Sequence, residues 1–578
     1  MSVLLCVRRL LPLPGIDDID NQANERLNTL EMRAEMYQVL NDRTRVCSKH
    51  EGVSPLFSKP KRRQTPGAII HGHLDCAIPR DRATRSSRQL LPAFAQATIL
   101  LLFGAGFSGS GWCDDVINIA SRRELFVDRY LIESLQNVRL RMHEPRDEGP
   151  TLKFDKPWEG PHAGYVTILN DDGRYRMYYR GISQYGPDGS EHERTCYAES
   201  TDAITWTKPD VGLYEFAGSK ANNIVLADAA PVTHNFCPMI DGKSGVLADE
   251  RFKALGGTGK SLFAYVSADG LKWKKLRDEP VLTNDQIKFE HSYQFDSQNL
   301  AFWSPHENCY VSYFRVVTTH RRIARCTSTD FVNWSDAVMM EQQHVDDSGT
   351  SPVPLEHLYT NQTSPYFRAP HIYLAIAARF FPGRKVLTDE QAKAINVNPK
   401  YFQDTSDAIL MSSRGGGVYD RTFLEGFVRP GIGPQNWVSR TNYPALNLAQ
   451  TSPIELSLYV NQDYAQPTSH VRRYSLRLDG FASAVAGAKE GQLVTKPFVF
   501  SGQALKINFS TSAGGGIRFG LEEVGGSTKQ ESLEQIGNEI ERTVTWQNEN
   551  AVKVLAGKPV RLRITLKDAD LYSLQFTP

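Results

Sequence analysis

The stretch Ser328-Thr-Asp-Phe-Val-Asn-Trp334 decides the fold, because its pattern of Ser, Asp and Trp recurs along the chain. Two further full copies span residues 200–206 and 267–273, and a degenerate copy spans residues 413–419. The serines that open the four copies are 67, 61 and 85 residues apart. Each full copy closes a unit of about four short strands, and repeats of that length and content are typical of β-propeller blades.

Each copy of this motif predicts a tight turn rather than a catalytic site. An Asp in such a turn accepts hydrogen bonds from backbone N–H groups, and the Trp is expected to pack between neighbouring blades. A fifth unit, which lacks the Trp, fits the apolar strands at residues 454–460 and 473–478. The sequence therefore predicts an all-β fold with a five-bladed β-propeller over residues 120–485.

The C-terminal residues 490–578 form a second predicted β-domain. Residues 505–509, 516–521 and 560–566 alternate between apolar and polar side chains, and Gly-rich turns separate them. Alternation of this kind leaves one face of a sheet buried and the other solvated. We therefore expect a C-terminal β-sandwich after the propeller.

The N-terminal residues resemble targeting sequence more than folded structure. Residues 1–80 are expected to be a disordered or non-native extension, and residues 81–113 are similar to a signal peptide. Arg82, Arg85 and Arg88 precede an apolar run at 97–107, which small residues follow. That run is too short to span a bilayer, so no stable membrane span is expected. A secreted, periplasmic or cell-surface location is predicted.

Composition excludes several other classes of function. Lys and Arg number 66 against 65 Asp and Glu, so the net charge of +1 provides no general attraction to nucleic acid. The four cysteines beyond the leader region show no spacing typical of zinc sites. Cys309 and Cys326 flank a predicted hairpin, where they either form a disulfide or remain buried thiols. No metal or cofactor is predicted, although Ca²⁺ in the propeller funnel stays open.

Candidate catalytic residues follow from the geometry of a propeller, in which the starts of the innermost strands face a central funnel. One residue per predicted blade meets this rule: Glu159, Asp241, Asp296, His371 and Glu455. Glycoside hydrolysis uses two carboxyl groups on either side of a sugar. Asp296 precedes an apolar run, where a charge is costly unless it lines a cavity. Asp241 lies in a sequence that is also typical of an ordinary turn.

Further candidates would bind the sugar rather than cleave it. Trp158 next to Glu159 offers a face on which a sugar ring can stack. Glu356, His357 and Glu425 lie in segments that also fit the funnel. Each of these residues can equally be a solvated loop residue, and the sequence alone leaves both interpretations open.

Short motifs resemble the five-bladed propeller glycosidases of families 32 and 43. Residues 328–334 are similar to their blade signature, and Phe295-Asp296 with the following strand resembles the second-carboxylate strand of family 32. Arg368-Ala-Pro-His-Ile-Tyr373 resembles a family 43 stretch that has the general acid Glu where this chain has Arg368. The resemblance implies a glycosidase fold, with Glu159 and Asp296 as the carboxylate pair and His371 or a displaced Glu as the acid.

The predicted function is therefore a secreted glycoside hydrolase that acts on a poly- or oligosaccharide. An anionic glycan is favoured, because Arg368 and the two further arginines Arg379 and Arg384 lie in one long segment at 361–404. Two alternatives stay open. One is a non-catalytic glycan-binding or surface propeller. The other is a sialidase-like hydrolase, a class that uses three arginines around a tyrosine nucleophile.

Overall fold

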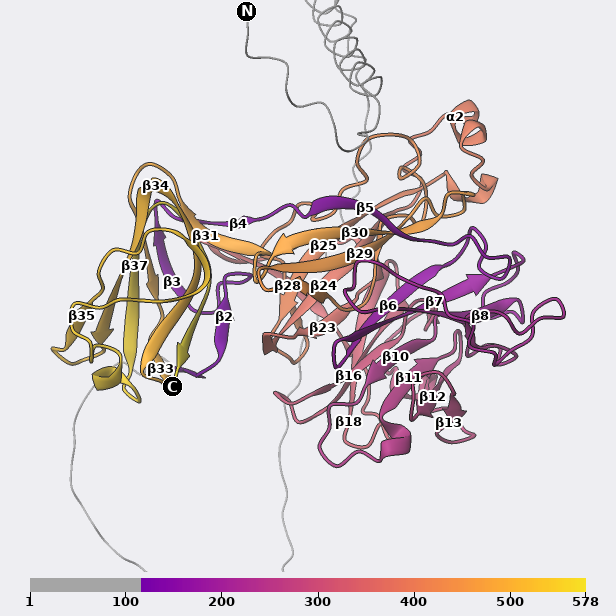
Figure 1. The fold of residues 1–578 in the computed structure, drawn as a ribbon, viewed down its shortest axis with the longest axis horizontal. Coiled ribbons are helices and arrows are strands. Elements are labelled where there is room, and N and C mark those ends of the chain that lie inside the picture. The colour runs from indigo at the N-terminus through magenta and orange to yellow at the C-terminus, as the bar shows by residue number, and fades with distance from the viewer. Residues whose placement is uncertain (1–115) are drawn as a thin grey trace, which may run out of the picture. The chain divides into compact units, whose positions relative to one another are not determined.

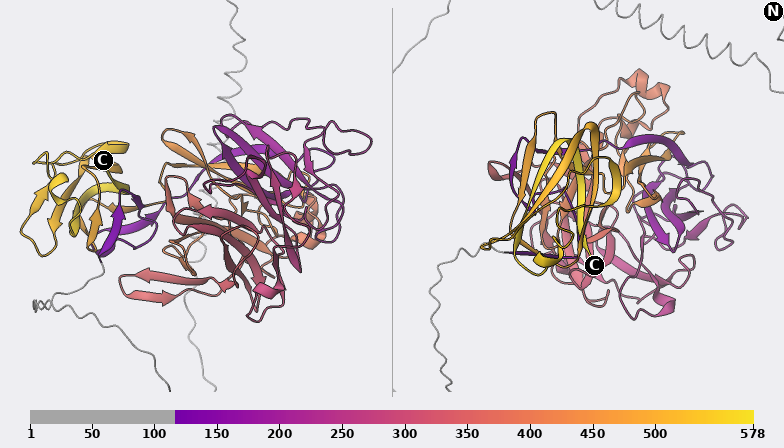
Figure 2. Two further views of the ribbon diagram at one scale, coloured as in Figure 1. Left: turned by 90° about the horizontal axis from the view of Figure 1, so that it is seen from below. Right: turned by 60° about the vertical axis from the view of Figure 1, so that its left-hand side comes forward.

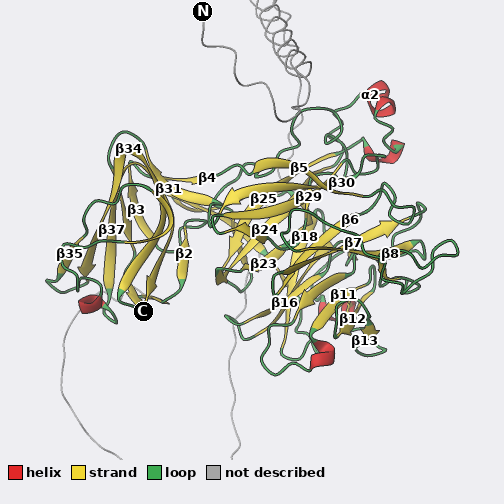
Figure 3. Ribbon diagram, in the orientation of Figure 1, coloured by secondary structure: helices red, strands yellow, loops and turns green. Residues whose placement is uncertain are grey.

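The computed structural model describes residues 116–578, and these residues form strands joined by loops (Figure 1 and Figure 3). The predictions for the leader residues 1–113 therefore lie outside the described residues. Within the described residues the helical elements are short. They are α2 (Asp389–Ala394) and the 3₁₀ turns Ala248–Glu250, Asn284–Gln286, Pro399–Tyr401 and Lys553–Leu555. The predicted all-β class is confirmed.

Five small sheets follow one another along the chain from residue 164 to residue 477. The first contains β6 (Gly164–Asp171), β7 (Arg174–Ile182), β8 (Glu193–Ser200) and β9 (Ile224–Leu226). The second contains β10 (Cys237–Ile240), β11 (Phe252–Gly256), β12 (Ser261–Ser267), β13 (Lys274–Lys275) and β14 (Leu282–Thr283). The third contains β15 (Tyr293–Gln294), β16 (Leu300–Ser304), β17 (Cys309–Val317), β18 (Arg321–Ser328) and β19 (Val338–Met339).

The fourth sheet is the largest of the five. It contains β20 (Glu341–Asp346), β21 (Gly349–Pro352), β22 (His357–Thr360), β23 (Thr363–Tyr366), β24 (Ala369–Phe381), β25 (Thr405–Ser413) and β26 (Val418–Asp420). The fifth contains β27 (Tyr443–Pro444), β28 (Ala449–Ser452), β29 (Glu455–Gln462), β30 (His470–Arg477) and β5 (Arg146–Lys153). Strand β5 comes from the N-terminal side of the whole array, so the fifth sheet joins its two ends (Figure 1).

One residue from each small sheet reaches a buried polar cluster. Gln298 donates to Thr167 Oγ1 at 2.6 Å, and Thr167 Oγ1 lies 3.8 Å from Cys237 Sγ. Gln362 donates to Gln298 Oε1 at 2.7 Å and to the carbonyl of Pro444 at 2.9 Å. Because buried polar groups need partners, these contacts bind the first strands of the sheets to one another. The sheets have a propeller-like arrangement.

The backbone repeats at the start of each first strand. Tyr165, Asn235, Phe295, Gln362 and Asn442 all have positive φ, between 45° and 61°. Residues other than glycine adopt this left-handed region uncommonly. Its recurrence once in each sheet shows that the five first strands begin with the same local bend.

The repeated motifs with Ser, Asp and Trp at 200–206, 267–273 and 328–334 form the predicted turns. The carboxylates of Asp202, Asp269 and Asp330 each accept two backbone N–H groups at 2.7–2.9 Å. The ring of Trp206 in the first sheet lies 5.9 Å from that of Tyr459 in the fifth. These aspartates are structural, and their tryptophan neighbours help to join adjacent sheets.

A separate eleven-stranded sheet contains both ends of the described chain. Its strands are β1 (Ile117–Ala120), β2 (Arg123–Leu125), β3 (Ile132–Gln136), β4 (Arg139–Met142), β31 (Ala482–Ala486), β32 (Gly491–Thr495), β33 (Phe498–Phe500), β34 (Ala504–Glu523), β35 (Lys529–Glu531), β36 (Asn538–Thr543) and β37 (Val560–Thr577). Figure 2 shows the indigo N-terminal strands among the yellow C-terminal ones. Alternating side chains of β34 and β37 supply its core, for instance Phe519 and Ile564.

This arrangement differs from the division expected at residues 120 and 490. Strands β1 to β4 pair with β33, β37, β32 and β31 rather than with the propeller-like array. The pairing joins residues at least 340 positions apart, and no local pattern in the sequence reports such a contact.

Candidate functional site

The starts of the first strands and the ends of the second strands converge at one end of the axis. Three arginines stand there: Arg180 near the end of β7, Arg315 near the end of β17, and Arg440 just before β27. With them lie Glu193, His234, Asp296, His162 and five tyrosines, Tyr165, Tyr359, Tyr401, Tyr443 and Tyr464. We call these residues the axial mouth.

Asp296 is the predicted catalytic residue that the structure places in the axial mouth. Its carboxylate pairs with the Arg315 guanidinium, and His234 Nε2 lies 3.4 Å from its Oδ1. Burial by itself disfavours the charged carboxylate, but the charge of Arg315 and the His234 contact outweigh it. They hold the pKa of Asp296 well below its usual range. Its side chain is 15% exposed, so an ionised oxygen borders solvent.

His234 lies between two carboxylates. Its Nδ1 is 2.8 Å from Glu193 Oε2, and its Nε2 faces Asp296. Burial lowers the pKa of this imidazole, but the contacts with Asp296 and Glu193 outweigh burial and raise it. Glu193 is also buried, and His234 and Arg180 hold its pKa below the usual value against desolvation. The structure therefore favours an imidazolium between two carboxylates.

The arginines of the axial mouth lie over aromatic rings. The guanidinium carbon of Arg315 is 4.2 Å from the ring centre of Tyr359, and that of Arg440 is 5.6 Å from the same ring. Arg180 lies 4.6 Å above Tyr165. Cation–π contacts of this kind keep guanidinium groups in place without neutralising them.

Several buried polar atoms of the mouth have no hydrogen-bond partner among the described residues. They are His162 Nε2, Arg180 Nε, Asn235 Nδ2 and Tyr443 Oη. Burial and the nearby Arg180 and Arg440 lower the pKa of His162 to about 4, so its ring is neutral at physiological pH. Leaving such atoms unpaired costs free energy in a stable core, and they are typical of a site that a ligand completes.

One group of side chains has the composition of a metal site. Asp188, Glu193 and His234 place ligand atoms within 4.8 Å of one another. Both ring nitrogens of His234 already have carboxylate partners, however, because Nδ1 faces Glu193 at 2.8 Å and Nε2 faces Asp296 at 3.4 Å. The trio fits a hydrogen-bonded cluster better than a metal centre.

Glu159 and Trp158, predicted for the first blade, lie outside the axial mouth. The Glu159 carboxylate is fully buried and accepts bonds from Tyr179 at 2.5 Å and Lys208 at 2.7 Å. Trp158 is half-buried, donates to Asn223 at 2.6 Å and packs edge-on against Phe216. Both residues hold the first sheet together.

His371 and Arg368 lie where the fourth sheet meets the eleven-stranded sheet. His371 Nε2 is 2.9 Å from Glu124 Oε1, and Arg368 pairs with Asp479 at 3.0 Å and Glu541 at 2.7 Å. These contacts occupy both side chains. Neither residue contacts the axial mouth in the described part of the chain.

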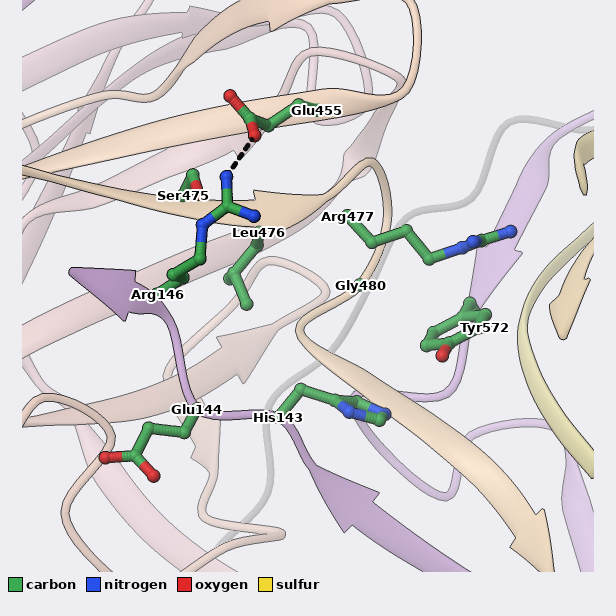
Figure 4. Close-up of a pocket in the computed structure, with 9 residues that line it drawn as sticks. All are labelled: His143, Glu144, Arg146, Glu455, Ser475, Leu476, Arg477, Gly480 and Tyr572. Atoms are coloured by element: carbon green, nitrogen blue, oxygen red, sulfur yellow. Dashed lines mark hydrogen bonds and ion pairs between the residues drawn. The ribbon is translucent and has the colours of Figure 1, made fainter. Parts of the chain in front are cut away.

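Glu455 begins β29 and therefore lies at the opposite end of the fifth sheet from the mouth. It pairs with Arg146 at 3.0 Å in a cavity of about 240 Å³ between β30 and the eleven-stranded sheet (Figure 4). Asp241 likewise follows β10 instead of preceding it. Its carboxylate contacts Lys253 at 2.9 Å and Tyr310 at 2.6 Å. Both carboxylates are part of structural ion pairs.

The remaining predicted binding residues do not reach the mouth either. Glu356 contacts Arg379 at 2.7 Å and Arg421 at 3.1 Å. Arg379, one of the arginines expected to bind an anion, is therefore already paired with a carboxylate. The His357 ring centre lies 4.6 Å from that of His320, and burial lowers its pKa. Glu425 is exposed on a loop. All four described cysteines are free thiols, including Cys309 and Cys326.

The placement rule failed at Glu159, which precedes the correct first strand β6 but is buried against Tyr179 and Lys208, and elsewhere three strands were assigned incorrectly. The first strands of the second, fourth and fifth sheets are β10, β23 and β27. The residues Asp241, His371 and Glu455 were instead predicted on the assumption that the more apolar β11, β24 and β29 are the first strands. Second strands run the opposite way, so their starts lie at the far end of the axis. Applied to the correct strands, the rule selects His234 before β10 and Arg440 before β27.

The chain was compared with family models, curated proteins and solved structures. No family model matches the chain, and no curated protein does. Similar solved structures include an N-acetylgalactosamine deacetylase from F. plautii, with 12% identity and a TM-score of 0.37 over 59% of this chain and 96% of that one. A family 43 arabinoxylan arabinofuranohydrolase from Bacillus subtilis has 11% identity and a TM-score of 0.33 over 72% and 96%.

A family 32 β-fructofuranosidase from Bombyx mori has 10% identity and a TM-score of 0.31, over 74% of this chain and 94% of that one. Families 43 and 32 are those that the sequence motifs resemble, and the propeller-like arrangement agrees with that resemblance. Likeness this low carries no argument about activity, which must come from the site itself.

Among the described residues, no helix is long and apolar enough to cross a bilayer.

Proposed function

We propose that the protein is a glycoside hydrolase that binds a poly- or oligosaccharide at the axial mouth. One observation carries the proposal: Asp296, chosen from sequence for this chemistry, stands at the mouth as a partly exposed carboxylate that Arg315 keeps ionised. A persistently ionised carboxylate is suited to act as base or nucleophile, or to stabilise positive charge on the sugar ring.

The proposed proton donor is Asp188. It is exposed on the loop after β7, and its carboxyl group lies within 4.8 Å of ligand atoms of Glu193 and His234. The carboxyl groups of Asp188 and Asp296 both lie near the His234 ring, and glycoside hydrolysis uses two carboxyl groups. In this proposal His234 does not touch the sugar, since it is buried, and it positions Asp296.

The finer features of the fold belong to the same proposal. We propose that the five small sheets are five blades around one axis and that the eleven-stranded sheet folds as a β-sandwich. The shared polar cluster at Thr167 and Gln298 supports the first point, and the core of the long strands β34 and β37 supports the second. A secreted or cell-surface location, suggested by residues 81–113, completes the proposal.

A test compares release of reducing ends from a panel of neutral and acidic polysaccharides by the full chain and its variants. Asp296→Asn should lower the rate by about 10²–10⁴-fold, because the ionised carboxylate is lost. Asp336→Asn, on the surface of the third sheet, is the matched control and should leave the rate unchanged. Equal rates for the wild type and Asp296→Asn would refute the proposal.

A non-catalytic glycan-binding propeller is the second candidate. The observation that favours it is that Glu193 and Asp296 are both engaged in ion pairs, so no two carboxylates face each other directly in the mouth. Binding of a saccharide without any hydrolysis would support this candidate. Burial raises the pKa of Tyr165 and Tyr443 and makes these two hydroxyls poor nucleophiles, so a sialidase-like reaction would need another tyrosine of the mouth.

A further inference from the structure

Arg440 differs from the other arginines of the axial mouth. Arg315 pairs with Asp296, and Arg180 lies 3.9 Å from Glu193. Arg440 forms no ion pair with a carboxylate among the described residues. Its Nη1 donates to Tyr401 Oη at 3.2 Å, and its other N–H groups have no hydrogen-bond partner in the part of the chain that the structure describes. A guanidinium has five donors, so most of its capacity is unused.

The backbone at this position is strained. Arg440 and Asn442 both have φ of 60°, in the left-handed region that side chains other than glycine rarely adopt. Asn442 shares this conformation with the residues near the start of the other first strands, and Arg440 adds a second left-handed residue in the fifth sheet. Here the ring of Tyr401 lies 5.0 Å from the Arg440 guanidinium, and that of Tyr359 lies 5.6 Å away.

The charges of the mouth also favour an anion. Arg180, Arg315, Arg440 and the imidazolium of His234 face the carboxylates of Glu193 and Asp296, with Asp188 at the exposed edge. The contacts of the two buried carboxylates are made with Arg180, Arg315 and His234. Arg440 is left without a carboxylate partner among the described residues, as is Arg321, whose guanidinium carbon lies 5.1 Å from the ring centre of Tyr359.

Two buried groups of the mouth add unused hydrogen-bonding capacity. The Nδ2 amide of Asn235 is a donor without a partner, and its Oδ1 accepts from Arg180 at 2.9 Å. His162 Nε2 is also unpartnered, and the charge of Arg440 contributes to the low pKa of that ring. Both side chains are more than nine-tenths buried, so water does not readily replace a missing ligand.

We infer that Arg440 binds an oxyanion on the saccharide, either the carboxylate of a uronic acid or a sulfate half-ester. A planar guanidinium makes two parallel hydrogen bonds to either group. The inference rests on the proposed function in that the ligand is a saccharide, but it needs no hydrolysis. It also moves anion recognition from Arg368, Arg379 and Arg384, where the sequence placed it, to a residue at the axis.

The test is equilibrium binding, by titration calorimetry on the full chain. The probes are sodium glucuronate, inorganic sulfate, and oligosaccharides that contain uronic acids or sulfate esters, with glucose as the neutral control. The wild type should bind one anionic class and not glucose. Arg440→Gln should weaken that binding about 10- to 100-fold, because a charged two-point contact is lost. Arg429→Gln, at an exposed arginine elsewhere, should leave binding unchanged.

Circular dichroism checks that the variants fold. If Arg440→Gln does not fold, Arg440→Lys replaces it, and a loss of about tenfold is expected because an ammonium makes no parallel pair of bonds. Preference for uronate over sulfate probes identifies the anion. Unchanged binding in both Arg440 variants, or equal binding of glucose, would overturn the inference.

The outcomes separate this inference from the proposed function. Asp296→Asn should still bind the anionic probe, since it keeps Arg440. Binding of the anionic probe without hydrolysis of any saccharide would contradict the proposed function and support the anion site. If the protein hydrolyses neutral saccharides and Arg440→Gln does not change that rate, the proposed function is supported and the anion site is contradicted.

Discussion

At the scale of single residues, environment rather than residue type separates the candidates for catalysis. Glu159 and Asp296 are both acidic and both lie next to apolar strands. Glu159 is fully buried against Lys208, whereas Asp296 keeps part of its surface at the axial mouth. An ionised carboxylate is useful in chemistry only where a substrate can reach it.

His234 should set the acid side of the pH profile. Burial alone raises the pKa of Asp296, and Arg315 with His234 lowers it to well below the usual value of about 3.9. His234→Asn removes part of the lowering influence, so Asp296 should become protonated at a higher pH. In kcat/KM measured from pH 3 to pH 7, the variant should lose activity toward pH 3 at a higher pH than the wild type does, while activity near pH 7 persists.

The exposed His306 offers a control for that experiment, and His306→Asn should leave the acid limb where it is. A purely structural role for His234 would lower activity equally at every pH, which would contradict the positioning role.

At the scale of elements, the fifth sheet shows how the array is closed. Its outer strand β5 comes from the N-terminal side, and Leu152 in β5 lies opposite Val471 in β30. Leu152 is the buried residue of an otherwise mostly exposed strand. The ladder joins segments more than 300 residues apart, and its contacts add to those that already join the first and fifth sheets, such as Trp206 with Tyr459.

Leu152→Ala should therefore lower the free energy of unfolding by about 3 kcal/mol, the usual cost of removing a buried leucine side chain. Urea denaturation measures it. Lys153→Ala, the exposed neighbour in the same strand, should change stability by less than about 0.5 kcal/mol. Similar losses for the two variants would show that β5 contributes through its backbone alone.

Strand identity explains how much of the site the sequence could predict. The repeats, the turns and Asp296 were predictable because they depend on local patterns. His234, Glu193 and Arg440 were missed, because the short first strands β10 and β27 carry a weaker apolar signal than the second strands. The placement rule applied to His234 and Arg440 would have found them, had those strands been recognised.

At the scale of the whole molecule, ion pairs connect the propeller-like array with the eleven-stranded sheet. Asp479 is fully buried and contacts Arg368 at 3.0 Å, Arg123 at 3.3 Å and Ser573 at 2.8 Å. A buried carboxylate with several partners is costly to disrupt. Arg368 thus belongs to this junction and not to the substrate site.

Arg368→Gln should reduce the free energy of unfolding by about 1–3 kcal/mol, because Asp479 and Glu541 lose a charged partner. KM and kcat for the saccharide should stay within about twofold of the wild type. Calorimetric unfolding and steady-state kinetics measure the two effects. A raised KM with unchanged stability would instead place Arg368 in substrate binding.

The sequence by itself determined the all-β class, the repeat, the Asp-containing turns and the position of Asp296 before a first strand, since each depends on residues close together in the chain. Only the tertiary structure decided that β5 joins β30, that β1 to β4 belong to the C-terminal sheet, and that three arginines meet at one mouth. These features pair segments hundreds of residues apart. Such contacts depend on which faces remain to be buried after each sheet has formed, and no local periodicity records that.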